Sequence, residues 1–382
     1  MVLKRIPKKA LLIIIIAEIF IGAWALTFIA WAMWNKPLGP TLEIVNQVNA
    51  QAAYPNPASR AASQGDAPGD GTSAQPDPTS PSFIDQVTRL ILQRPQPVQT
   101  ICGGPPVLTL LVIGSDSRDS GYYAGLADTI RVVRFDFATP SMIMVDFPRD
   151  LWVEIPGISE HGVDHGKINQ AYFFGNPGMG YYDGADAGPG LLAKTLQLNY
   201  GLHRIDNYIA VDMHTFRNII DSIGGIDVNI SNGLNLNQGD SSNPDYVFSP
   251  GINHLDGERA LILARSRIPS TFQRARFQNI VLEALKDKLL DPAMIPQLPG
   301  LFTQFNQSVQ TDLSLKEINK LICLGQALSP ENISMVAFPE EMFTSEHTYD
   351  PYRGVSTSTL GVDNALMRSY IADFMKGTWP AP

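Results

Sequence analysis

Three apolar stretches lie close together in the chain, each bordered by polar residues, and they constrain the fold more than any other feature. Val107–Ile113 is almost entirely apolar, which is typical of a strand buried on both faces. Thr129–Phe135 and Ser141–Phe147 follow with a similar character. Beyond them, strand patterns alternate with helix patterns. We therefore predict an α/β fold, a three-layer α-β-α sandwich around a mixed central sheet.

Charged residues stand where these three strands begin or end. Asp116 follows the first strand, Asp128 precedes the second, and Arg149 follows the third. Ligands commonly bind at strand ends in α/β sheets. Carboxylates hold Mg²⁺ and guanidinium groups bind phosphate oxygens in pairs. One such acid–arginine pair is usually a solvated surface pair, but several at consecutive strand ends favour a site for an anion and a divalent metal.

A second informative region contains two helical patterns. The first pattern ends at Arg265, and the second covers Phe272–Leu290. At about 100° per residue, Arg274 and Gln278 fall on the apolar face of the second helix, whereas Arg276 falls on the opposite, solvated side. An inward arginine needs an anionic partner. That partner is either a bound anion or a buried aspartate.

The N-terminus has the pattern of a membrane anchor. Met1–Lys9 is basic, and Ala10–Trp34 contains one charge, Glu18, in 25 residues. A helix of that length reaches about 37 Å, longer than a hydrocarbon core of about 30 Å. Because basic flanks stay in the cytoplasm, we predict a cytoplasmic tail over 1–9, a transmembrane signal anchor over 10–34, and an extracytoplasmic remainder of the chain.

Composition divides the rest of the chain. Residues 35–100 are predicted to be a flexible extracytoplasmic linker, disordered at about 46–82, where Ala, Pro, Ser, Gly and Gln dominate. Residues 101–340 are expected to form the folded domain. Residues 341–382 are expected to be a C-terminal extension with one helix, about 362–375, and no chemical motif.

Charge and cysteine usage narrow the function further. A net charge of -9 disfavours nonspecific binding to nucleic acid. The two cysteines, Cys102 and Cys323, do not have zinc-site spacing. Outside the cytoplasm two cysteines can pair, so we predict a disulfide between them.

The order and spacing of several short motifs resemble the LytR-CpsA-Psr (LCP) family, over about half of the chain. The motifs are Gly114-Ser115-Asp116-Ser117-Arg118, Ala127-Asp128-Thr129, Pro148-Arg149-Asp150, Lys167-Ile168-Asn169-Gln170-Ala171-Tyr172, Ile223-Gly224-Gly225-Ile226-Asp227-Val228, and Arg265-Ser266-Arg267 followed by Arg274 and Gln278.

The resemblance implies a membrane-anchored phosphotransferase. Such an enzyme moves a glycopolymer from a polyprenyl-pyrophosphate carrier to a peptidoglycan hydroxyl and forms a phosphodiester. By similarity, Asp116 and Asp128 hold Mg²⁺ and belong to a catalytic set completed by Arg149, Arg265 and Arg267. The residues implied to bind pyrophosphate are Arg118, Arg149, Lys167, Arg265, Arg267, Arg274 and Gln278. Asp128 is also our candidate for the base that accepts the proton of the acceptor hydroxyl.

The chain departs from the family pattern at three positions. Thr271 and Phe277 stand where the family usually carries an aspartate and an arginine, and Asn279 stands where a glutamine is usual. Because Phe277 falls on the apolar face, we expect a contact to pyrophosphate or to a carboxylate to be missing. The departure bears on substrate identity more than on reaction class.

Two other functions fit the same residues. The first is a hydrolase that splits the lipid pyrophosphate, with water in place of the sugar hydroxyl. The second is a non-enzymatic module that binds lipid-linked intermediates and regulates. Binding alone needs the arginines but not a complete pair of acids, so loss of Asp116 distinguishes the module from the enzymes.

Overall fold

The computed structural model describes residues 31–43, 98–117, 122, 124–238, 242–266, 271–305 and 308–380. Two predicted site residues, Arg118 and Arg267, lie outside these ranges, as do the predicted disordered segment at 46–82 and residues 1–30. Within the described residues, no helix is both long enough and apolar enough to cross a membrane. The predicted anchor at 10–34 falls outside the described residues except for its last four positions.

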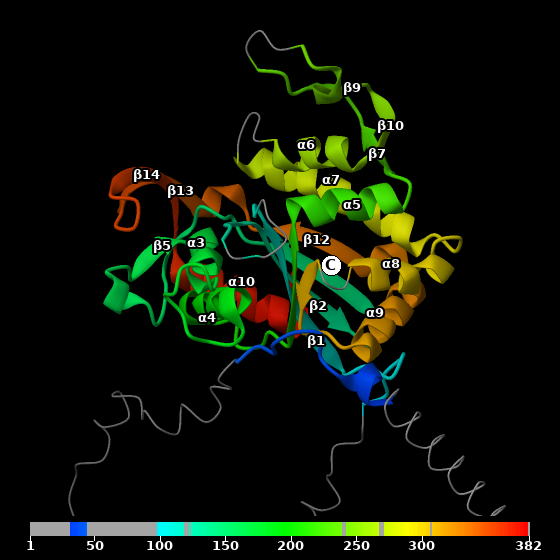
Figure 1. The fold of residues 1–382 in the computed structure, drawn as a ribbon, viewed down its shortest axis with the longest axis horizontal. Coiled ribbons are helices and arrows are strands. Elements are labelled where there is room, and N and C mark those ends of the chain that lie inside the picture. The colour runs from blue at the N-terminus through cyan, green and yellow to red at the C-terminus, as the bar shows by residue number, and fades with distance from the viewer. Residues whose placement is uncertain are drawn as a thin grey trace, which may run out of the picture.

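A mixed six-stranded sheet forms the centre of the described structure (Figure 1). Strands β1, β3, β6 and β12 run in one direction, and β2 and β11 run antiparallel to their neighbours. The predicted mixed sheet is therefore confirmed. In spatial order the strands are β11 (Val309–Thr311), β6 (Asn207–Asp212), β1 (Val107–Ser115), β2 (Ala127–Asp136), β3 (Ser141–Asp146) and β12 (Ile333–Ala337).

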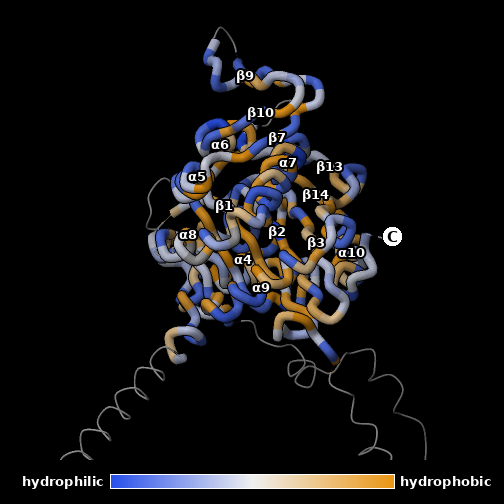
Figure 2. Tube along the Cα trace, turned by 90° about the vertical axis from the view of Figure 1, so that its right-hand side faces the viewer, coloured by the Kyte–Doolittle hydropathy of each residue, from blue (hydrophilic) through white to orange (hydrophobic). Residues whose placement is uncertain are grey.

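Helices cover both faces of this sheet because side chains alternate along each strand. On β1, Leu111 and Ile113 pack into one apolar cluster, whereas Leu108 and Leu110 pack into another on the opposite face. Figure 2 shows hydrophobic positions concentrated on these strands and on the helices against them. The first face carries α3 (Ile168–Gly175), α4 (Ala187–Tyr200) and α10 (Asn364–Lys376), and the second carries α9 (Leu315–Ala327).

A further layer lies over the edge of the sheet where β1, β3, β6 and β12 end (Figure 1). It has its own apolar cluster, to which Phe277 and Val281 belong. The polar stretch Asn232–Ser249 contains two short paired strands. The elements of this layer are α5 (Met213–Ser222), β7 (Ile226–Ile230), β8 (Leu234–Asn235), β9 (Val247–Phe248), β10 (Gly251–Leu255), α6 (Gly257–Arg265) and α7 (Thr271–Leu290).

The C-terminal residues are part of the same core. Met367, Ile371 and Phe374 of α10 are buried in the cluster beneath the sheet. A β-hairpin precedes α10, and the sequence analysis did not predict it, because its strands carry exposed Ser and Thr without an apolar alternation. The hairpin strands are β13 (Phe343–Asp350) and β14 (Val355–Val362), and the remaining elements are β4 (Trp152–Glu154), β5 (His165–Lys167) and α8 (Leu298–Phe305).

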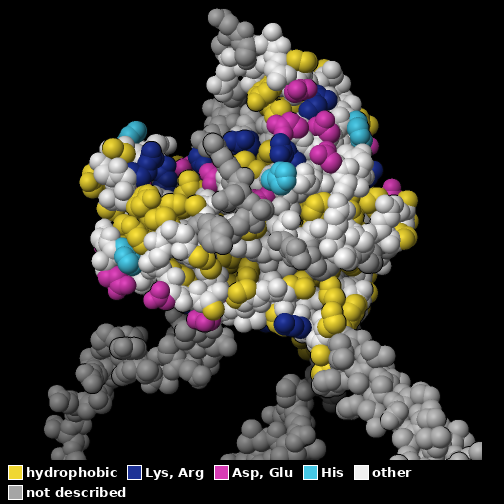
Figure 3. Space-filling model, viewed as in Figure 1, with side chains coloured by type: hydrophobic (Ala, Val, Ile, Leu, Met, Phe, Trp, Pro, Cys, Tyr) yellow, Lys and Arg dark blue, Asp and Glu magenta, His cyan; other side chains and the backbone are white. Residues whose placement is uncertain are grey.

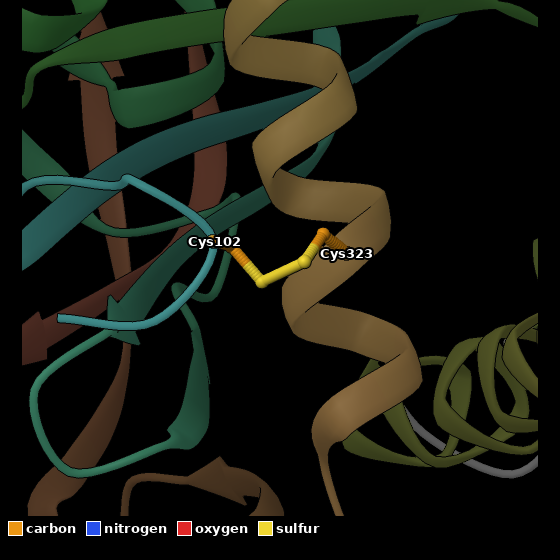
Figure 4. The surroundings of a disulfide bond; sticks show 2 residues. All are labelled: Cys102 and Cys323. Carbon is orange, nitrogen blue, oxygen red and sulfur yellow. A yellow bond between two sulfur atoms is a disulfide. The ribbon is translucent and has the colours of Figure 1, made fainter.

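The predicted disulfide is confirmed. Cys102 lies in the loop before β1, Cys323 lies on α9, and their Cα atoms are 5.8 Å apart (Figure 4). The bond joins residues separated by 221 positions. It therefore ties the start of the sheet to the helix that covers one of its faces.

Residues 35–43, which the sequence placed in the linker, lie against the domain. We call them the strap. The N–H of Leu38 donates to the carbonyl of Leu313 at 3.3 Å, and the N–H of Leu42 donates to Asp312 at 3.4 Å. The N–H of Glu43 donates to Asp186 at 2.8 Å. The strap therefore borders the edge strand β11 and is held by backbone hydrogen bonds, with Leu42 packed against the apolar cluster of the first face.

Candidate functional site

The carboxyl ends of β1 and β3 and the start of β2 bring the predicted acids and Arg149 to one edge of the sheet. Ser115, the last residue of β1, pairs with Ala127 at the start of β2. Asp116 and Asp128 therefore leave neighbouring strands at the same level. Arg149 follows β3, which pairs with β2 on its other side. The fold thus confirms the convergence predicted from the strand ends.

Asp116 is held by the backbone of the segment that precedes β2. Its Oδ1 accepts the N–H of Leu126 at 2.6 Å, and the N–H of Asp116 donates to the carbonyl of Leu126 at 3.0 Å. Burial raises the pKa of Asp116, and the nearby charge of Asp128 raises it further, against the opposing effects of Leu126, Arg149 and Arg265. Two like charges share a confined space here, which is the electrostatic situation that a bound cation relieves.

Asp128 is surrounded by arginines from two elements. Its Oδ1 accepts a hydrogen bond from Arg149, and its Oδ2 lies 3.7 Å from the Nη1 of Arg274 on α7. The side chain of Arg274 is only 6% exposed. The predicted inward direction of Arg274 is therefore confirmed, and Asp128 is one of its anionic partners.

The network continues from Arg149 toward α3. Arg149 Nε lies 3.4 Å from Asp150, whose other oxygen accepts a hydrogen bond from the Nζ of Lys167 at 3.0 Å. Burial opposes the charge of Arg149, but Asp128 and Asp150 outweigh it and raise the pKa of that guanidinium. Burial also opposes the charge of Asp150, and Arg149 and Lys167 outweigh it and lower its pKa. Acids and bases therefore alternate across the site.

The second predicted helix presents its residues as the helical wheel indicated. Gln278 and Arg274 line a narrow hollow of about 20 Å³ beside Asp128 and Arg149. Arg276 is exposed and pairs with Glu340 at 2.8 Å, as a solvated residue does. Phe277 is buried in the apolar cluster of the upper layer. The aromatic side chain packs among apolar residues, so the missing polar contact predicted at this position is consistent with the fold.

Two larger hollows open on either side of α6. The first, about 390 Å³, is lined by Asp128, Tyr246, Ile262 and Arg265, among others. The second, about 330 Å³, is lined by Asp116, His214, Arg217, and again by Arg265. The two hollows share Glu258, Leu261 and Arg265, which form one stripe along α6. Each hollow falls in the size range of a small-molecule site.

Arg265 stands where the two hollows meet. It is the last residue of α6 and is exposed, unlike Arg149 and Arg274. Figure 3 shows basic and acidic side chains gathered along the band where the upper layer meets the body of the domain. The site is thus a charged seam between two layers, with room on both sides for substituents of a bound anion.

Sequence reasoning missed three charged residues near the site. Asp146, the last residue of β3, faces both Arg131 and Arg274. Asp150 had been quoted in a motif but was given no role. Arg131 had been treated as part of an apolar strand. A charged residue inside an otherwise apolar strand was the available signal, because such a residue is rarely buried without a partner.

The described acids are compatible with a magnesium site. Mg²⁺ is commonly held by one or two carboxylates together with substrate phosphates and water. Asp116 and Asp128 supply the carboxylates, and burial, with the charge of Asp128 added, raises the pKa of Asp116. Within the described part of the chain, no group of three or more His, Cys, Asp or Glu residues forms a metal cage. The donor set therefore fits a cation that needs an anionic ligand to complete its shell.

Comparisons with known proteins follow the same motifs. Residues 100–367 match the LytR_cpsA_psr family. TagU of Oceanobacillus iheyensis, named a polyisoprenyl-teichoic acid–peptidoglycan teichoic acid transferase, is 32% identical over 218 residues, 56% of this chain and 62% of TagU. The regulatory protein MsrR of Staphylococcus aureus is 31% identical over 210 residues, 54% of this chain and 56% of MsrR. The matches thus span somewhat less than two thirds of either relative.

A solved structure shares the fold. The crystal structure of B. subtilis TagV aligns with 72% of this chain and 98% of its own, with a TM-score of 0.55 and 23% identity. The layered arrangement described above is therefore that of known proteins with this fold.

Proposed function

This chain belongs to the LytR-CpsA-Psr family, and from that premise we propose that it is a membrane-anchored glycopolymer phosphotransferase. Its donor is a glycopolymer on a polyprenyl-pyrophosphate carrier, and its acceptor is a hydroxyl of peptidoglycan. The name of TagU, a transferase that joins teichoic acid to peptidoglycan, supports this substrate class.

One observation carries the proposal: Arg265 lies where two hollows meet, beside the two acids. A transferase must bring two large substrates to one phosphorus atom. The hollows at Asp128 and at Asp116 lie on opposite sides of α6 and share Arg265. That arrangement gives a donor and an acceptor separate approaches to a common diphosphate.

The reaction needs positioning and charge stabilisation more than covalent chemistry. The acceptor oxygen forms a bond to the sugar-linked phosphorus, and the bond from that phosphorus to the bridging oxygen breaks. Polyprenyl phosphate leaves with the bonding electrons, and the hydroxyl proton passes to a base or to solvent. Arg149, Arg265 and Arg274 bind the diphosphate oxygens and stabilise the negative charge that builds on the leaving group.

Asp116 and Asp128 would hold Mg²⁺ together with the diphosphate. Bound there, Mg²⁺ supplies charge neutralisation for the phosphoryl oxygens. Asp128 is a poor choice for the base, because its two oxygens already face Arg149 and Arg274. We therefore assign Asp128 to binding and orientation rather than to proton transfer.

The hydrolase and the regulatory module remain the competing functions. A hydrolase uses the same diphosphate site with water as the acceptor. The regulatory alternative is favoured by the resemblance to MsrR, which is named a regulatory protein. Neither alternative requires the second large hollow.

The decisive experiment incubates the full-length chain with a polyprenyl-pyrophosphate oligosaccharide and Mg²⁺, with and without peptidoglycan fragments. Variants Asp116→Ala and Arg265→Ala are compared with Arg276→Ala, an exposed arginine of the adjacent helix α7. We expect glycan transfer by the wild type and by Arg276→Ala, and loss of transfer in the other two variants and after chelation. Release of polyprenyl phosphate without transfer would favour the hydrolase. Binding without turnover, unchanged in Asp116→Ala, would favour the regulatory module.

A further inference from the structure

Arg131 is a buried arginine in the middle of β2, outside the set of site residues described by the motifs. It is 1% exposed and is among the largest fully buried side chains of the described structure. Its Nη1 donates to Asn279 of α7 and contacts the sulfur of Met144 at 3.4 Å. Within the described residues, its Nε and Nη2 have no hydrogen-bond acceptor in good geometry. Burying a guanidinium with N–H groups that lack acceptors lowers the stability of the fold. A buried arginine at this position therefore points to a role beyond packing.

The partner of Arg131 is Asp146 on the neighbouring strand. The two residues are directly opposite in the register of β2 and β3, and Arg131 Nε lies 3.3 Å from Asp146 Oδ1. Asp146 is 8% exposed and is the last residue of β3. Three residues later in the chain stands Arg149, so the pair lies directly beneath the site.

Asp146 also lines the narrow hollow that Arg274 lines. Burial raises the pKa of Asp146, and the charges of Arg131 and Arg274 both oppose that rise by favouring its ionised form. Arg274 in turn lies 3.7 Å from Asp128. Arg274 is therefore placed between two carboxylates, one beneath it and one beside it. Which carboxylate holds its guanidinium depends on how much of the charge of Asp146 is already neutralised.

We propose that Arg131 is a positioning residue, which neutralises Asp146 and so keeps Arg274 directed toward Asp128 and a bound diphosphate. This inference rests on the proposed function and adds a residue that acts on the site from within the core. Without Arg131, Asp146 is a buried carboxylate on which the charge of Arg274 still acts. The guanidinium of Arg274 is then drawn down to Asp146 and away from the substrate.

The net charge of the network supports this role. The cations Arg131, Arg149, Lys167, Arg265 and Arg274 face four carboxylates, Asp116, Asp128, Asp146 and Asp150. These described residues have one positive charge in excess. Removing Arg131 removes that excess from a site built for an anion.

Two variants separate this role from simple support of the core. In Arg131→Met the charge is lost while an apolar side chain fills the space. In Arg131→Met with Asp146→Asn the carboxylate is neutralised as well, so nothing draws Arg274 downward. The matched control is Arg134→Met, which removes another buried arginine of β2, one paired with Asp136 at 3.0 Å and donating to the carbonyl of Met375.

The measurement is binding of farnesyl diphosphate with Mg²⁺ to the full-length chain, by calorimetry, beside the thermal midpoint of each variant. We expect Arg131→Met to weaken binding about tenfold, which corresponds to about 1.4 kcal/mol. The double variant should recover most of that loss, and Arg134→Met should lower the thermal midpoint without changing affinity. Arg131→Lys keeps the charge of the site, and Asp146→Asn makes the site more positive. Each of these variants should bind farnesyl diphosphate within about threefold of the wild-type affinity.

Each other outcome has a clear meaning. Wild-type affinity in Arg131→Met, or a double variant that binds no better than Arg131→Met, overturns the positioning role. If Arg131→Met does not fold, the double variant and Asp146→Asn carry the test, and weak binding by both overturns the role. A wild type that does not bind the diphosphate overturns the proposed function and this inference together.

Discussion

The two ends of the central sheet show two ways of burying aspartate. At the end nearest the site, the acids Asp128 and Asp150 are compensated by arginine and lysine side chains. At the opposite end, Asp312 accepts the N–H of Tyr208 at 2.8 Å, the amide of Asn207 at 3.3 Å and the N–H of Leu42 at 3.4 Å.

The difference teaches what each end is for. A backbone N–H is fixed by the fold and cannot move to another hydrogen-bond acceptor. A guanidinium carries five donors on a long side chain and can exchange a carboxylate for a phosphate. The end with Asp312 is therefore built to hold a geometry, and the end nearest the site is built to change partners when an anion arrives.

The largest expected effect tests the site end through Asp128→Asn. The change keeps the shape but removes the charge that orients Arg149 and Arg274. We expect initial rates of transfer to fall about a thousandfold, or about 4 kcal/mol. Asp136→Asn, at the other end of β2, is the control and should retain the wild-type rate. Equal losses in the two variants would remove the distinction between the ends.

The next prediction concerns the disulfide, at the end of the sheet opposite the site. Replacing Cys102 and Cys323 with serine opens a loop of 221 residues. We expect the free energy of unfolding to fall by about 3 kcal/mol, measured by urea denaturation. The transfer rate per folded molecule should stay unchanged. A lower rate in the folded fraction would show that this end also controls the chemistry.

Arg265→Ala tests the exposed arginine that is shared by the two hollows. Because its side chain is solvated before substrate binds, its removal should cost stability less than about 0.5 kcal/mol. We expect kcat/KM to fall about thirtyfold, or about 2 kcal/mol. The measurement is steady-state kinetics beside thermal unfolding. A destabilised variant with normal kinetics would instead make Arg265 a structural residue.

The smallest effect is a pH dependence at Asp312. Burial raises the pKa of its carboxyl to about 6 in the folded state, above an unfolded value of about 3.9. The folded state then binds more protons between these values, so stability falls as pH rises from about 4 to 6 and levels off above. Asp312→Asn should flatten that decline, by on the order of 2 kcal/mol, in urea unfolding measured at several pH values. An unchanged slope would mean that another group titrates there.

Much of the site could be predicted because its residues stand at element boundaries. Asp116, Asp128 and Arg149 border apolar strands, and the wheel of one helix separated inward Arg274 from outward Arg276. These positions depend on local pattern, which the sequence displays directly. The strands Val107–Ile113 and Thr129–Phe135 were recognisable for the same reason.

Other features depend on contacts that no local pattern contains. Arg131 and Asp146 face each other only because β2 and β3 pair in one register. The hairpin Phe343–Val362 lacks apolar alternation, because it is exposed along most of its length. The strap is polar and proline-containing and is held by backbone donors, so its side chains gave no sign that it would lie on the domain.

The strap also limits how the domain can rotate relative to residue 31. Both sides of residues 44–97 are fixed to the domain. Before them, the N–H of Glu43 donates to Asp186, and shortly after them the N–H of Ile101 donates to the carbonyl of Phe137. Changing their length therefore leaves the path from residue 31 into the fold untouched. The hydrogen bonds of residues 35–43 therefore fix residue 31 relative to the charged seam. In the anchored arrangement that we propose, the strap would orient the seam relative to the point of attachment, independently of residues 44–97.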